Sequence, residues 1–209
     1  MMKELKLFPD FIEPTNILLK DGEAIYFGSV LNLNEADHYL HTFLENISWK
    51  NDRGITAGKS YVSERKIAWF DEKSSLHASI ARSSLWKNEI RKLITLVESY
   101  AHTQFNACLF NLYATGKQGV GWHCDEEAQQ PRKATIASLS LGAERRFDFR
   151  HIHTNETVSI TLEHGSLLIM RGVTQHFWKH QLAKTAKISD PRINLTFRQT
   201  RPTRQQFSR

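Results

Sequence analysis

The sequence predicts an α+β fold, in which a helical N-terminal half packs against a C-terminal β-sandwich or barrel. Apolar residues recur at helical spacing in two segments before residue 105. After it, short β-rich segments follow one another, separated by glycine-containing or polar breaks, as in all-β sandwiches and barrels. The 209 residues, 40% hydrophobic and 11% aromatic, suffice for one globular domain with a sizeable core.

Residues 1–20 alternate around two prolines and are expected to form extended arms or loops. The first predicted helix covers Asn34–Glu45, with Asn34 as its N-cap and an apolar stripe of Ala36, Leu40, Phe43 and Leu44. The second runs roughly from 84 to 102, with Ser84 as its cap. Its stripe contains Trp86, Ile90, Leu93, Ile94, Val97 and Tyr100. Both stripes are expected to face the core.

Seven short strands are predicted after Phe105, and no internal repeat is visible. They are Asn106–Tyr113, Thr135–Leu141, Arg146–His151, Thr157–Leu162, Ser166–Met170, His176–His180 and Arg192–Gln199. The alternation of side chains along such strands decides which residues share a face, and therefore which of them can form a site.

The composition predicts a soluble protein of a reducing compartment. There are only two cysteines, Cys108 and Cys124, so no disulfide framework is implied. No signal peptide is visible, and the apolar run Leu167–Met170 is far too short to span a bilayer. We therefore expect a monomer in the cytoplasm, or in the nucleus of a eukaryote, with no membrane partner.

The charge balance is basic. The net charge of +6 and the pI near 9.4 favour polyanionic partners such as nucleic acid. The last nine residues, 201–209, contain three arginines and no acidic residue. We expect this tail to be a solvated chain end, with phosphate contacts as the alternative.

A histidine and an aspartate stand two residues apart in the segment Gly121–Glu127. On an extended segment His123 and Asp125 project to the same face. One imidazole and one carboxylate, joined by a second histidine, form the facial triad of non-haem Fe(II) oxygenases. In a chain with 10 histidines and 22 acidic residues, the pair alone also fits a polar turn.

Two histidines compete for the third ligand position. His180 is the main candidate, and His176 is its rival because it would share a face of the same predicted strand. Three other histidines lie between the pair and the last strand, where turn or surface roles are more natural: His151, His153 and His164.

The last predicted strand has one face that carries two arginines, an amide and a hydroxyl: Arg192, Asn194, Thr196 and Arg198. This set suits a small dianion, because the guanidinium fork binds carboxylates in a bidentate way. Asn111 and Tyr113 share a face of an earlier strand in the same manner. An exposed polar face is the alternative interpretation.

These motifs resemble the AlkB family of Fe(II)/2-oxoglutarate-dependent dioxygenases. The resemblance rests on His123-x-Asp125, His180 and the run Arg192–Arg198, and it covers residues 105–200 almost continuously. It implies a double-stranded β-helix (jelly-roll) core with a nucleotide-recognition lid. The single domain, 1–209, would contain N-terminal helices and the lid in 1–105, the catalytic core in 106–200 and a basic tail in 201–209.

The resemblance also implies a role for each site residue. Fe(II) would be held by His123, Asp125 and His180. Arg192 would bind the distal carboxylate of 2-oxoglutarate, in a site completed by Asn111, Tyr113, Asn194, Thr196 and Arg198. Glu127 would lie near the damaged base, so that Asp125 and Glu127 are the expected catalytic carboxylates. Cys124 should point away from the metal.

The implied activity is oxidative demethylation of N-alkylated bases, of the 1-methyladenine or 3-methylcytosine type, in DNA or RNA. O2 and 2-oxoglutarate would be consumed, and succinate and formaldehyde released. Because a base inside a duplex cannot reach a buried metal, the substrate is expected to be single-stranded or flipped out. Two alternatives stay open: an Fe(II)/2-oxoglutarate hydroxylase that acts on a small molecule or a protein, and a non-catalytic nucleic-acid-binding module.

The segment 64–71 resembles the family's lid and departs from it in several places. Glu64 replaces the usual proline, Asp71 stands where glycine is common, and the paired tyrosines that normally follow are absent. The candidate substrate contacts are Lys59, Arg65, Trp69, Phe70, His77 and Glu127. For the two aromatic residues a core role is the alternative, and for the histidine a surface role.

Overall fold

The computed structural model describes residues 13–56, 59–71, 85–125 and 134–200. The elements along the chain are β1 (Thr15–Asn16), β2 (Glu23–Ser29), α1 (Leu33–Asn46), β3 (Lys50–Thr56), β4 (Lys59–Asp71), α2 (Leu85–Ala101), β5 (Ala107–Tyr113), β6 (Val120–His123), β7 (Ile136–Gly142), β8 (Arg145–His151), β9 (Thr157–Leu162), β10 (Ser166–Arg171), α3 (Thr174–Phe177), β11 (Trp178–Leu182) and β12 (Arg192–Arg198). None of the helices described is long and apolar enough to cross a membrane.

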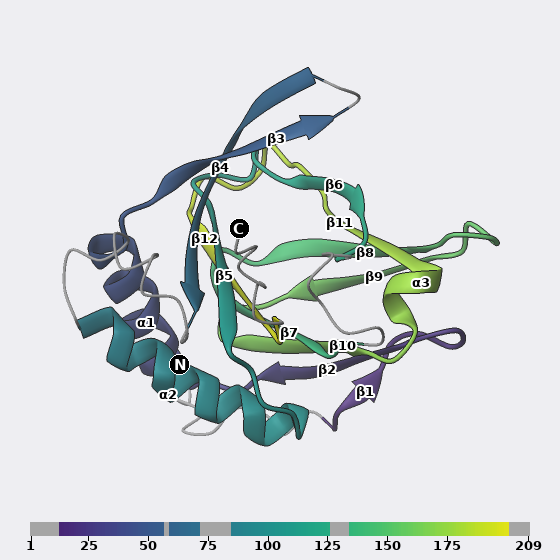
Figure 1. Cartoon of the computed structure of the whole chain (residues 1–209), viewed down its shortest axis with the longest axis horizontal. Coiled ribbons are helices and arrows are strands. Elements are labelled where there is room, and N and C mark those ends of the chain that lie inside the picture. The colour runs from purple at the N-terminus through teal and green to yellow at the C-terminus, as the bar shows by residue number, and fades with distance from the viewer. Residues whose placement is uncertain (1–12, 57–58, 72–84, 126–133, 201–209) are drawn as a thin grey trace, which may run out of the picture.

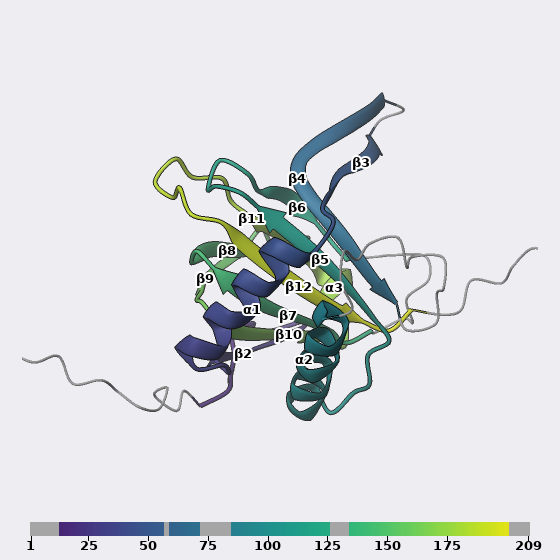
Figure 2. The same cartoon turned by 90° about the vertical axis from the view of Figure 1, so that its left-hand side faces the viewer.

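Two antiparallel sheets form the scaffold (Figure 1). The larger sheet has eight strands in the order β1-β2-β10-β7-β12-β5-β4-β3, and the smaller has four in the order β6-β11-β8-β9. The helices α1 and α2 lie side by side on the outer face of the larger sheet (Figure 2). The predicted sandwich or barrel is therefore observed, and its larger sheet lies between a helical layer and the smaller sheet.

The sequence predicted a helical N-terminal half, but the structure shows that this half also contains strands. Strand β2 pairs with β10, and β4 pairs with β5, so that strands from the first 71 residues extend the larger sheet at both edges. The hairpin of β3 and β4 projects beyond the rest of the sandwich (Figure 1). The prediction missed β2 because its partner lies near the other end of the chain, where Met170 pairs with Ala24.

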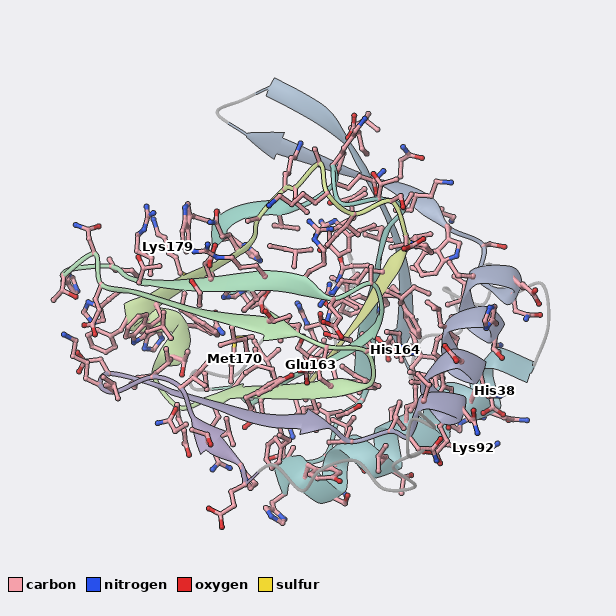
Figure 3. The ribbon with its side chains drawn as sticks, turned by 180° about the vertical axis from the view of Figure 1, so that it is seen from behind. His38, Lys92, Glu163, His164, Met170 and Lys179 are labelled. Carbon is pink, nitrogen blue, oxygen red and sulfur yellow. The ribbon has the colours of Figure 1, made fainter. Side chains whose placement is uncertain are left out.

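Helix α1 is capped by Asn32, two residues before the predicted cap Asn34. The Asn32 side chain accepts a 3.0 Å hydrogen bond from the Glu35 N–H, and the Glu35 carboxylate accepts one of 3.0 Å from the Asn32 N–H. Asp37, three residues after the predicted cap Asn34, accepts a 3.2 Å hydrogen bond from His164, which lies in the turn between β9 and β10 and is labelled in Figure 3. The longer glutamate side chain can reach back to its cap and therefore decides where the helix begins.

Two apolar cores lie on the two faces of the larger sheet. The outer core holds the described residues of the predicted stripes of both helices, including Phe43, Ile90 and Val97, against Phe110 and Leu195. The inner core fills the space between the sheets and contains Ile136, Phe149, Leu168, Met170 and Trp178, among others. Each fully buried side chain of this size contributes about 1.5–3 kcal/mol. The inner core surrounds the polar pocket described next.

Candidate metal and anion site

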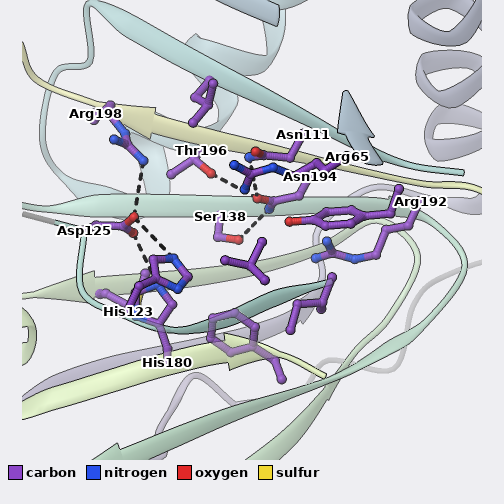
Figure 4. Close-up of a pocket in the computed structure, with 16 residues that line it drawn as sticks. Arg65, Asn111, His123, Asp125, Ser138, His180, Arg192, Asn194, Thr196 and Arg198 are labelled. Carbon is purple, nitrogen blue, oxygen red and sulfur yellow. Dashed lines mark hydrogen bonds and ion pairs between the residues drawn. The ribbon is translucent and has the colours of Figure 1, made fainter. Parts of the chain in front are cut away.

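Two histidines and an aspartate converge between the sheets (Figure 4). His123 at the end of β6 is the direct partner of His180 on β11, and their ring centroids are 4.3 Å apart. Asp125 follows β6 by two residues. The ligand atoms of the three side chains all lie within 4.8 Å of one another, and no other such group occurs in the described part of the chain. The three side chains are therefore close enough to bind a single metal ion.

A β-bulge in β6 directs these side chains. His123 pairs with His180, whereas Val120 pairs with Leu182, so three steps along β6 match two along β11. In a regular strand Val120 and Trp122 would share a face. The extra residue turns Val120 and His123 toward the pocket, and Trp122 lines a separate hollow on the outer side of the sheet.

The tautomers of the histidines suit metal binding. The Nδ1–H of His123 donates a 2.8 Å hydrogen bond to the carbonyl oxygen of Gly121, which leaves the Nε2 lone pair directed at Asp125, 3.9 Å away. The Nε2 of His180 lies 3.5 Å from the same carboxylate. Burial lowers the pKa of His180 to about 4. The neutral imidazole, which is the form that binds metals, therefore predominates at neutral pH.

The carboxylate of Asp125 stays ionised although it is buried. Burial opposes ionisation, but the electrostatic interactions with His180 and Arg198 outweigh it and lower the pKa of Asp125. The Arg198 guanidinium lies 3.5 Å from the Asp125 Oδ1. The side chain of Gln175 accepts a 2.9 Å hydrogen bond from the Asp125 N–H and so anchors its backbone. Two imidazoles and one carboxylate fit the donor set of a non-haem Fe(II) site.

The other end of the pocket is built for an anion. Arg192 is 2% exposed and donates a 2.9 Å hydrogen bond to Ser140, and its guanidinium carbon lies 5.7 Å from the Tyr113 ring centroid. Among the described residues its Nε has no hydrogen-bond partner, and no carboxylate compensates its charge. Burial lowers the pKa of Arg192 to about 10. A buried cation without a counter-ion is costly, so this end of the pocket is complementary to an anion.

The predicted polar face of the last strand points into the pocket and is buried, which rules out the alternative of an exposed face. Asn194 donates a 2.7 Å hydrogen bond to Ser138 and accepts bonds from Thr196 at 3.0 Å and Asn111 at 3.4 Å. The pocket holds about 520 Å³ of empty space. Its polar wall consists of Arg65, Asn111, Tyr113, Ser138, Arg192, Asn194, Thr196 and Arg198.

The candidate substrate contacts are distributed differently from the prediction. Arg65 lines the pocket and pairs with Asp52 of β3. Phe70 is buried in the outer core and Trp69 packs against it, so neither aromatic residue lines the pocket. Lys59 belongs to β4, but its side chain is outside the described set. The remaining two candidates, His77 and Glu127, lie outside the described residues.

His176, the rival ligand, is not in the cluster. Residues 174–177 form the short helix α3 instead of the predicted strand, and the His176 side chain is exposed there. The strand β11 begins only at Trp178, which leaves His180 as the histidine that faces the site. Cys124 does not line the pocket, as expected; its Sγ lies 3.7 Å from the carbonyl oxygen of Trp178.

Two further polar residues support the site and were missed by the sequence prediction. Gln175 reaches Asp125 from α3, a contact across 50 residues of chain. Arg145, 2% exposed, donates hydrogen bonds of 3.1, 2.9 and 2.7 Å to the carbonyl oxygens of Gly116, Gln118 and Ala183, and so joins the loops next to the pocket. Neither residue belongs to a recognisable motif, because each acts through distant backbone groups.

Comparison with known proteins gives a consistent result. The family model of the 2OG-Fe(II) oxygenase superfamily matches residues 23–198. The chain is 36% identical over 202 residues to the alpha-ketoglutarate-dependent dioxygenase alkB homolog 3 of Homo sapiens, covering 91% of this chain and 69% of that protein. It is 38% identical over 122 residues to the DNA oxidative demethylase ALKBH2 of Bos taurus, covering 54% of this chain and 43% of that protein.

The fold agrees with these relationships. The solved structure of OsALKBH1 superposes with a TM-score of 0.59 at 16% identity, over 87% of this chain and 100% of that one. The sandwich is therefore the double-stranded β-helix of these oxygenases, as expected. This chain belongs to the AlkB-homologue family of the 2OG-Fe(II) oxygenase superfamily and is a dioxygenase that uses Fe(II), 2-oxoglutarate and O2.

Proposed function

We propose that the protein is an oxidative demethylase of N-alkylated bases, of the 1-methyladenine or 3-methylcytosine type, in DNA or RNA. The observation that carries the proposal is one pocket with a His-Asp-His cluster at one end and the buried, uncompensated Arg192 at the other. The kinship with a DNA oxidative demethylase, over about half of the chain, supports the substrate class. Succinate and formaldehyde are the expected products.

The metal end would be held by His123, Asp125 and His180. When bound there, Fe(II) supplies the oxidative chemistry that converts 2-oxoglutarate to succinate and an N-methyl group to formaldehyde. The protein keeps the His180 imidazole neutral and the Asp125 carboxylate ionised before the metal arrives. The burial of Arg192, Arg198 and His180 strengthens the electrostatic contacts that they make in the pocket.

The co-substrate would lie along the inner face of β12. Arg192 is assigned to the distal carboxylate of 2-oxoglutarate, because it is the buried arginine that lacks a counter-ion. Asn111, Tyr113, Asn194 and Thr196 supply hydrogen-bonding groups around it. Arg198, at the metal end, is assigned to both the co-substrate site and the orientation of Asp125.

The substrate would approach past the β3–β4 hairpin, which we assign as the lid, with Arg65 at the pocket wall and Lys59 on the same strand. Glu127 and His77 remain candidate base contacts. The base would come from a single strand or be flipped out of a duplex. We further propose that the chain acts as a monomer, in which 1–105 provides the helices and the lid, 106–200 the catalytic core and 201–209 a basic tail, and that it works in the cytoplasm or nucleus.

The test uses purified protein with Fe(II), ascorbate, 2-oxoglutarate and a short single strand that carries 1-methyladenine or 3-methylcytosine. Mass spectrometry follows the loss of the methyl group, and succinate is measured in parallel. Removal of the methyl group with matching succinate is the expected result. Succinate alone would favour the small-molecule or protein hydroxylase, and neither product from metal-loaded protein would favour the non-catalytic binding module.

A further inference from the structure

The outer face of the smaller sheet carries an aromatic and basic cluster that the catalytic pocket does not use. Trp122 on β6, Arg150 on β8 and Lys179 on β11 line a common hollow of about 510 Å³. Arg150 and Lys179 are direct partners across the two strands, and the Arg150 guanidinium carbon lies 4.2 Å from the centroid of the Trp122 ring. Figure 3 shows Lys179 on this side of the sheet. We call these three residues the outer platform.

The charges of the outer platform are not neutralised within the described part of the chain. Both basic side chains are exposed, and neither has a carboxylate within ion-pair distance. The contrast with Arg146 on the same face is direct, because its Nε lies 2.6 Å from the carboxylate of Asp148. Two uncompensated cations beside a partly exposed indole are complementary to phosphate and to a stacked base.

The position of the platform relates it to the pocket. Trp122 is the residue before His123, and because neighbouring side chains of a strand alternate, His123 faces the pocket and Trp122 the outer hollow. Strand β6 is at the edge of the smaller sheet, so a chain of nucleotides can pass from one side to the other around it. A base in the pocket would leave its neighbours within reach of the outer face.

We infer that the outer platform binds single-stranded nucleic acid next to the target base, with a base stacked at Trp122 and phosphates held by Arg150 and Lys179. This inference rests on the proposed function. The hollow has one large exposed apolar side chain, Ile152, which is 38% exposed. The two exposed cations beside it lack a carboxylate partner among the described residues, and this charge suits a polyanion.

The experiment compares the double variant Arg150→Gln/Lys179→Gln with the matched control Arg91→Gln/Lys117→Gln, which removes two exposed charges from α2 and from the loop before β6. Binding of a methylated single strand of about 15 nucleotides is measured from low to high salt. Each phosphate contact on a single strand contributes about 0.7 to the slope of log affinity against log salt. In the platform variant the slope should become shallower by about 1.4, because two phosphate contacts are lost. The control should leave the slope unchanged.

Turnover separates the platform from the pocket. The nucleoside 1-methyladenosine has no neighbouring nucleotide that could reach the platform, so its demethylation should be the same in the platform variant and the wild type, whereas the variant should need a higher concentration of the longer strand for half-maximal turnover. In Trp122→Leu the affinity for the longer strand should fall about 5- to 150-fold, because the stacking contact is lost. Its affinity for Mn(II) serves as the control, because Trp122 adjoins His123.

The outcomes distinguish the two proposals. If the wild type demethylates the strand but the platform variant has the same salt slope as the wild type, the platform is overturned. The proposed function then remains intact. A wild type that neither binds nor demethylates the strand would overturn both. An equal loss of turnover on the nucleoside and the longer strand would mean that these residues support the pocket, and would also overturn the platform.

Discussion

Arg198 and Asp125 form a 3.5 Å ion pair that joins the last strand to the metal end of the pocket. Arg198 is 2% exposed, so the pair lies away from solvent, and it contributes to the lowered pKa of the Asp125 carboxyl. The arginine that the family resemblance assigned to the co-substrate therefore also orients a candidate metal ligand.

Replacement of this arginine should weaken metal binding. In Arg198→Gln we expect the affinity for Mn(II) to fall about 10- to 100-fold, the usual effect of losing a partner that orients a ligand. Isothermal titration calorimetry in the absence of oxygen measures this affinity. Lys117→Gln removes an exposed charge from a loop and is the matched control. An Mn(II) affinity equal to that of the wild type would assign Arg198 to the co-substrate alone.

Asp125→Ala should abolish turnover, because it removes the only carboxylate of the cluster. Succinate and demethylated product should both fall below detection, while the thermal unfolding of the variant shows that it is folded. Asp190→Ala, at an exposed position, is the matched control. Substantial turnover by Asp125→Ala would mean that the metal lies elsewhere.

Arg192→Ala should raise the requirement for 2-oxoglutarate and leave metal affinity nearly unchanged. A buried, hydrogen-bonded charge pair contributes about 2–5 kcal/mol, so the Michaelis constant for 2-oxoglutarate should increase roughly 30-fold or more. Steady-state kinetics with 2-oxoglutarate as the varied substrate measures this constant. Arg192→Lys keeps the charge without the guanidinium fork and should be intermediate. Equal effects on the Michaelis constant and on metal affinity would refute the assignment.

Gln175→Leu should disturb the metal end through the backbone of Asp125. The hydrogen bond from the Asp125 N–H would be lost, and we expect the Mn(II) affinity to fall by about tenfold, with the Michaelis constant for 2-oxoglutarate unchanged. Gln175→Glu retains an acceptor oxygen at the same reach and should keep most of the affinity. If both variants lose it equally, the hydrogen bond is not the cause.

Acid should destabilise the metal-free protein through His180. Its pKa is about 4 in the folded state and 6.5 as the ordinary value, so between these values the unfolded chain binds a proton that the folded chain does not. The free energy of unfolding is therefore highest above pH 6.5 and falls as the pH approaches 4. The difference of 2.5 (6.5 − 4) corresponds to about 3 kcal/mol.

Urea unfolding at pH 7 and pH 4.5 measures this change. His180→Gln lacks the titrating group, so its free energy of unfolding should depend much less on pH over the same interval. A pH dependence as steep as that of the wild type would locate the effect in other groups.

The local sequence pattern was sufficient to predict those elements whose structure depends mainly on residues close by in the sequence. The apolar stripes of α1 and α2 and the alternation along β12 are visible in the sequence, and the structure buries the same faces. The predicted ligands His123, Asp125 and His180 come together as expected. These results follow from the periods of helix and strand, which any continuous segment displays.

Long-range contacts decided the rest. The edge strand β2 acquires its structure from β10, and the short helix α3 replaces a predicted strand because the chain must turn between β10 and β11. The bulge in β6 has no signature in four residues of sequence, yet it turns Val120 into the pocket, away from the face that Trp122 occupies. Trp69 and Phe70 were candidates for base contacts, and only the packing of the hairpin strand against the helices places them at the core.

Successive residues of β12 meet opposite demands. Ile193, Leu195 and Phe197 belong to the outer core, and the residues between them line the pocket. Directed evolution can exploit this division. A library that varies the odd positions together with the helix faces would search for thermostability with little effect on chemistry. A library that varies the even positions would instead change the co-substrate site and the support of Asp125.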